Sequence, residues 1–120
     1  QVMVSTLDDT KRLAIAGALE DMKAIQNLII ENEQTLIGQC ADQEICDRLR
    51  DMHRDDQKNM GVLDTVIVQY GVKGQPKQTT LEMVEKTRKL MSGSELTLFE
   101  KFVQHELLKH GQVMKGLLIH

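Results

Sequence analysis

The sequence predicts an all-α protein, folded as an up-down-up-down four-helix bundle. Two observations carry this prediction. Apolar residues recur every three or four positions through four separate segments, and no strand-like alternation competes with that period. The connections are short, and helices joined by short loops pack antiparallel. The 120 residues suit one domain, 1–120. Because the helical pattern is still running at His120, we expect this domain to be cut from a longer chain.

The first helix is expected to begin near Ser5 or Thr6 and to end before the turn at Gly38. Asp8 and Asp9 would then stand in its first turn, where acidic groups interact favourably with the helix dipole. An apolar stripe with helical spacing defines the face that we expect inside. It consists of Ile15, Ala18, Met22, Ile25, Ile29 and Leu36.

The second helix is expected to start at Asp42, a residue type that caps helix N-termini, and to end at Gly71. Its inward face carries Ile45, Leu49, Met52, Met60, Leu63, Ile67 and Tyr70. The longest connection of the chain follows and holds its only proline, Pro76.

The third helix is expected over about 79–91, and the fourth after a tight turn, with Ser94 as its N-cap. The third helix would turn Met83, Val84, Leu90 and Met91 inward. The apolar line of the fourth consists of Phe99, Phe102, Val103, Val113 and Leu117.

Polar residues interrupt these apolar faces at one level of the bundle. Glu106 and His110 lie one turn apart on the stripe of the fourth helix, and His53 and Asp56 form a similar pair on the second. Counting helix rise from the two starts places both pairs at the same depth. Gln26 of the first helix lies near that level, and His105 is a further candidate about a quarter-turn away.

A carboxylate in this position needs a partner, because burying it alone costs several kcal/mol. We therefore expect a metal site with His53, Asp56, Glu106 and His110 as ligands, completed by Gln26 or His105. Mixed imidazole and carboxylate ligands suit mono- or dinuclear nonheme iron, zinc, or manganese. The alternative is a metal-free layer in which His and carboxylate groups satisfy one another.

At these residues the chain resembles the hemerythrin-like, or HHE cation-binding, family. The matching segments are His53-Arg54-Asp55-Asp56-Gln57 and the stretch from His105 to His110. The resemblance implies a hemerythrin/ferritin-like bundle with nonheme iron. The chain departs from the pattern because Gln57 replaces a bridging Glu, and because the expected first and third helices carry no His.

The sequence thus predicts a hemerythrin-like metal-binding bundle that senses or stores metal, oxygen or redox state, and it favours no enzymatic activity. The expected partners are a metal ion and dioxygen, with a second copy or an adjoining domain. The alternatives are a metal-free structural or partner-binding bundle and a histidine phosphotransfer domain, whose signature fits poorly because Lys115 follows His110 by five residues.

Charge and composition exclude other classes in this interpretation. The net charge is −3 with acids and bases interspersed, so we expect no nucleic-acid partner. We expect no membrane partner either, because no apolar run is long enough to span a bilayer. With two cysteines, Cys40 and Cys46, and no secretory signal, the cytoplasm is the expected location.

Overall fold

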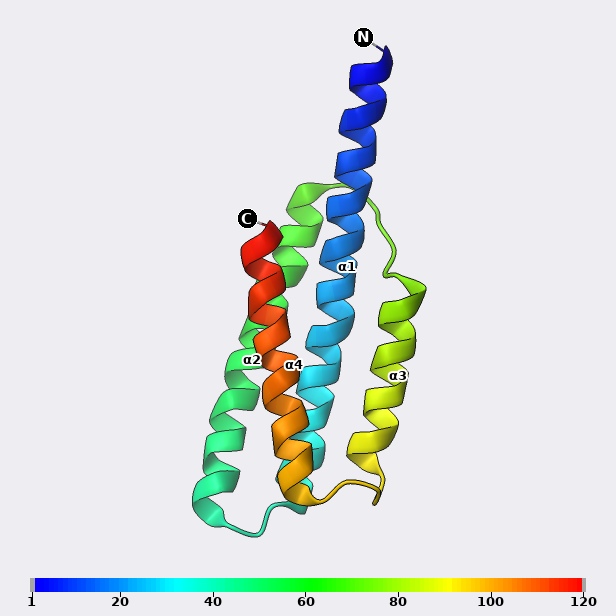
Figure 1. The fold of residues 1–120 in the computed structure, drawn as a ribbon. Coiled ribbons are helices and arrows are strands. Elements are labelled where there is room, and N and C mark those ends of the chain that lie inside the picture. The colour runs from blue at the N-terminus through cyan, green and yellow to red at the C-terminus, as the bar shows by residue number, and fades with distance from the viewer. Residues whose placement is uncertain (1, 120) are drawn as a thin grey trace.

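Four long helices run alternately in opposite directions along one axis. The computed structural model describes the backbone of residues 2–119 and the side chains of residues 8–114. Its elements are α1 (Val2–Gln39), α2 (Gln43–Tyr70), α3 (Gln78–Ser92) and α4 (Leu98–Ile119). Figure 1 shows α1 descending, α2 rising, α3 descending and α4 rising. The predicted all-α four-helix bundle is confirmed, while its relation to hemerythrin or ferritin stays a prediction.

Helix α1 is the central element of the bundle. It packs against each of the other three helices, with α3 on one side and α2 and α4 on the other (Figure 1). Its N-terminal end projects past the other helices, and the molecule measures 61 × 26 × 19 Å. The expected start at Ser5 or Thr6 is wrong, because the helix already runs from Val2. Within the described residues, no helix combines the length and the apolar character needed to cross a membrane.

The ends of the helices follow local side-chain chemistry. Asp42 caps α2 as predicted, since its carboxylate accepts a hydrogen bond from the Ile45 amide at 3.1 Å. Gly71 ends that helix in the left-handed conformation, with φ 73°. Helix α4 starts later than predicted. Thr97, not Ser94, opens it by exchanging hydrogen bonds with Glu100 in a capping box.

The core consists of two apolar clusters stacked along α1. One contains Ile25, Leu28, Ile29 and Val84, and the other contains Leu36, Leu49 and Met91. Leu108 of α4 packs against the first cluster, and Phe102 packs against the second. Glu33 lies between them on the same face of α1. The apolar core is therefore divided by a polar layer at about the middle of the bundle.

Helix α4 runs in the predicted direction, but it is rotated about its own axis relative to the prediction, so that different residues face the core. Most of its predicted apolar line faces solvent, with Phe99 76% exposed and Val103 and Val113 also exposed. Phe102 of that line packs against the core, and His105 is 1% exposed. The side of the helix that packs inside carries the polar residues Lys101 and His105 together with Phe102 and Leu108. Ile15 and Ile45, expected inside on α1 and α2, are exposed as well. Leu117, also expected inside, lies outside the described side chains.

Candidate functional site

A buried carboxylate, Glu33 of α1, forms the centre of the polar layer. Its side chain is 0% exposed. One oxygen, Oε2, lies 3.0 Å from Nε2 of His105 on α4, and the other, Oε1, lies 3.5 Å from Nδ1 of His53 on α2. The Lys109 ammonium lies 3.8 Å from Oε2. A single carboxylate thus contacts side chains from two neighbouring helices.

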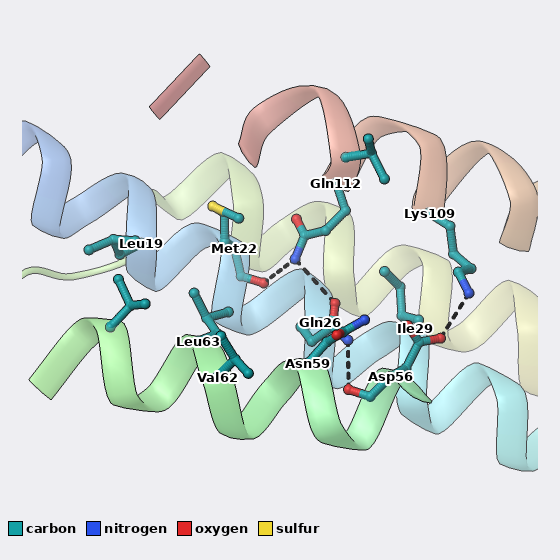
Figure 2. Close-up of a pocket in the computed structure, with 12 residues that line it drawn as sticks. Leu19, Met22, Gln26, Ile29, Asp56, Asn59, Val62, Leu63, Lys109 and Gln112 are labelled. Atoms are coloured by element: carbon teal, nitrogen blue, oxygen red, sulfur yellow. Dashed lines mark hydrogen bonds and ion pairs between the residues drawn. The ribbon is translucent and has the colours of Figure 1, made fainter. Parts of the chain in front are cut away.

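Asp56 of α2 forms the second acidic position of the layer. Lys109 Nζ donates a hydrogen bond to its Oδ2 at 3.0 Å. Gln26 of α1 donates to the Asp56 backbone carbonyl at 2.9 Å. Figure 2 shows both bonds converging on Asp56 from α4 and α1. We call Gln26, Glu33, His53, Asp56, His105 and Lys109 the polar layer.

Burial controls protonation in this layer. Burial, together with a hydrogen bond and charge repulsion from Asp56, raises the pKa of Glu33 from its ordinary 4.5 to about 8. Burial likewise lowers the pKa of His105 from 6.5 to about 4, with the Lys109 charge acting in the same direction. Burial also opposes ionisation of Asp56, but hydrogen bonds from Glu33 and Lys109 outweigh it and hold the Asp56 pKa below its usual range. At neutral pH the layer therefore contains a protonated Glu33, a neutral His105 and an ionised Asp56.

Lys109 supplies the positive charge that the acidic groups require. Its ammonium lies within 4 Å of both Glu33 and Asp56, the place where a bound cation would compensate them. Within the described part of the chain, no group of three or more His, Cys, Asp or Glu side chains is arranged to hold a metal ion. The layer is thus compensated by an ammonium group and hydrogen bonds.

The structure brings together four of the six predicted ligands. Gln26, His53, Asp56 and His105 all lie in the polar layer. Glu106 and His110 do not, since both are exposed on the outer side of α4. Their expected inward position was wrong for the same reason as the apolar line of that helix: α4 packs through its opposite face.

Sequence reasoning did not assign Glu33 or Lys109 to the site, although each carries a signal. Glu33 follows Ile29 by four residues and precedes Leu36 by three, so it continues the buried stripe of α1. Lys109 follows His105 by one turn, which places both on one side of α4. Whether Glu106 or Lys109 faces the core depends on the rotation of α4 about its own axis.

A pocket of about 330 Å³ opens beside the polar layer, between α1, α2 and α4. Its walls are mostly apolar, with Leu19, Met22, Ile29 and Leu63 among them, and Asp56 and Lys109 stand at one end (Figure 2). The amide of Gln112 crosses the pocket and donates to the Met22 backbone carbonyl at 2.6 Å. Through this pocket, Gln26, Asp56 and Lys109 of the polar layer can be reached by a ligand.

Comparison with known proteins gives one curated relative. A DNA nickase from Nostoc sp. (strain PCC 7120 / SAG 25.82 / UTEX 2576) is 58% identical over 118 residues, which is 98% of this chain. The chain spans about a third of that relative, 34% of its length. No protein-family model and no solved structure matches the chain. The hemerythrin-like resemblance accordingly stays a prediction.

This relative overturns two expectations from the sequence. The predicted function in metal, oxygen or redox sensing or storage, with its hemerythrin-like and metal-binding character, is wrong, because the relative is named for action on DNA. The expected absence of a nucleic-acid partner is wrong for the same reason. It rested on the charge of a segment that spans a third of the relative, which says little about the charge of the rest. Iron, zinc and manganese as cofactors stay predictions.

Proposed function

We propose that this chain takes part in the cleavage of one strand of duplex DNA. The observation that carries the proposal is its 58% identity to a DNA nickase over nearly its whole length. Because the chain matches only about a third of that relative, the proposal concerns the contribution of this bundle to nicking. We include a cytoplasmic location in the proposal, since both cysteines are free thiols.

The polar layer holds groups that phosphodiester hydrolysis uses. In hydrolysis, a water oxygen bonds to phosphorus and one phosphorus–oxygen bond to deoxyribose breaks. A general base takes the proton of the water, and the leaving oxygen gains a proton from solvent. Imidazole is the commonest such base, and a cation stabilises the charge that develops on the phosphoryl group. His53 and Lys109 provide these two groups.

Accessibility selects His53 and Lys109 from the layer. Glu33 and His105 are sealed inside, whereas the side chains of His53 and Lys109 are 14% and 27% exposed. Both contact the same buried carboxylate, through opposite oxygens. Glu33 lies within 4 Å of both groups and would act as a positioning residue that keeps the imidazole and the ammonium close together at the edge of the bundle.

The test is a nicking assay with the purified chain and supercoiled plasmid in magnesium buffer, read as conversion to open circles. We expect nicking by the wild-type chain and a loss of about 100-fold or more in the His53→Gln variant, because the general base is removed. His110→Gln is the matched control, since this exposed histidine lies on the outer side of α4 and outside the layer. Its rate should equal that of the wild type.

Two results would count against the proposal. Wild-type chain that leaves the plasmid supercoiled would remove a nicking role for this bundle. Equal rates in both histidine variants would remove His53 as the acting group. Circular dichroism of each variant establishes that the helices are intact, so that lost activity is not mistaken for lost fold.

A further inference from the structure

Helix α4 carries an apolar surface on its outer side, away from the polar layer. The surface, here called the outer α4 face, consists of Phe99, Val103, Glu106, Leu107, His110 and Met114. Its apolar members follow one another at a spacing of four or seven residues, which places them in one line along the helix. The line extends for roughly 22 Å, at about 1.5 Å per residue.

This face is unusual because large apolar side chains of α4 are exposed while polar side chains of the same helix are buried. Leu107 is 62% exposed, while His105 and Lys101 of the same helix are buried. Phe99 and Leu107 are mostly exposed, and Val103 and Met114 are exposed too, so these side chains form one continuous apolar patch, and such patches are often functional. A shallow depression lies on this face between Phe99 and His110. A surface of this shape can receive the side chains of another helix.

We propose that the outer α4 face binds the same face of a second copy of this chain, with the two helices antiparallel. The distribution of polar groups favours this occupant. On this face Glu106 lies one turn before His110. An antiparallel pair brings the acidic part of each helix against the histidine of the other, and it also aligns the helix dipoles favourably.

The two-fold symmetry of such a pair sets its centre. With the axis close to Leu107, the two Leu107 side chains meet in the middle, and Glu106 of each copy lies beside His110 of the other. Phe99 and Val103 then pack against the later turns of the opposite helix. The two polar residues of the face are paired with each other, and its apolar line is covered on both copies.

The experiment is sedimentation equilibrium of the purified chain over a range of concentrations. We expect a mass twice the 13.6 kDa of the chain. Leu107→Glu should weaken association by about 100-fold or more, because it places two carboxylates at the centre of the interface. Leu13→Glu is the matched control, since Leu13 lies on α1 near the end of α2, outside the outer α4 face, and is exposed to a similar extent, 57%. It should leave association unchanged.

A charge exchange tests the antiparallel arrangement. His110→Glu alone should weaken the dimer about tenfold, because it sets two acids against each other at both ends of the pair. Adding Glu106→Lys should restore association to near the wild-type level. A monomer at every concentration would overturn the proposal, as would a dimer that Leu107→Glu leaves intact. If the double variant associates no more tightly than His110→Glu alone, the antiparallel pairing would be overturned.

Discussion

Glu33 is the residue around which the polar side chains in the interior of this protein are arranged. It stands between two apolar clusters and contacts His53, His105 and Lys109. Burial raises its pKa to about 8, so the side chain is protonated at neutral pH and can exchange its proton slightly above that pH. Such a group links the stability of the fold to pH.

The stability of the chain should fall as pH rises from 6.5 to 8. A raised Glu33 pKa stabilises the fold fully below 4.5, and this contribution is lost as pH rises through about 8. The lowered His105 pKa acts oppositely, since its contribution is present above 6.5 and is lost as pH falls toward 4. The two effects oppose each other between 4.5 and 6.5. Above 6.5 the Glu33 contribution is the larger of the two, with a slope of at most about 1.4 kcal/mol per pH unit.

Urea unfolding at a series of pH values measures this slope. The Glu33→Gln variant keeps the shape of the side chain but has no proton to lose, so its stability should be nearly flat from 6.5 to 8. Parallel curves for the variant and the wild type would show that the slope has another origin.

Lys109 compensates the ionised Asp56 carboxylate, and its replacement should be costly. Lys109→Met leaves Asp56 buried without its cation, which we expect to lower the free energy of unfolding by about 3 kcal/mol. Lys23→Met provides the control. Lys23 pairs with Asp64 at 2.9 Å, but the two side chains are 40% and 47% exposed, so solvent screens the pair and the loss should stay below about 1 kcal/mol. Equal losses in chemical denaturation would contradict the compensating role of Lys109.

At the scale of the elements, local signals in the sequence were sufficient for most helix ends. Asp42 and Gly71 mark the limits of α2 because capping depends on residues close in the chain. The rotation of α4 could not be predicted in the same way. The helix has more apolar residues on one side than on the other, and the apolar side of an amphipathic helix normally faces the core. Here the inside already contains Glu33 and Asp56, which select His105 and Lys109 as partners.

The connection between α2 and α3 depends on a close approach to α1. A Cβ atom at Gly74 would lie 2.5 Å from the backbone carbonyl carbon of Ala16 and from the amide nitrogen of Gly17. Gly74→Ala should therefore destabilise the fold by about 1–3 kcal/mol, because backbone must shift. Gly61→Ala, within α2 and with open space around it, should instead stabilise by about 1 kcal/mol. Thermal unfolding of both variants measures these changes. Midpoint temperatures that shift in the same direction in both variants would contradict the close packing at Gly74.

At the scale of the whole molecule, the sequence predicted the bundle and the depth of its polar layer, because both follow from periodicity and helix length. It also identified four members of that layer: Gln26, His53, Asp56 and His105. It did not predict the action on DNA that we propose. Net charge and motif spacing describe this chain alone, whereas the relation to a DNA nickase lies in the identity of residues along its whole length.

The central claim is that this bundle contributes to DNA nicking through the exposed edge of its polar layer. The most direct measurement compares the rates at which the wild type, His53→Gln and His110→Gln convert supercoiled plasmid to open circles. We predict rapid conversion by the wild type and by His110→Gln, with a rate about 100-fold lower for His53→Gln. A folded wild-type chain without nicking, or a His53→Gln variant that nicks as fast as the wild type, would contradict the claim.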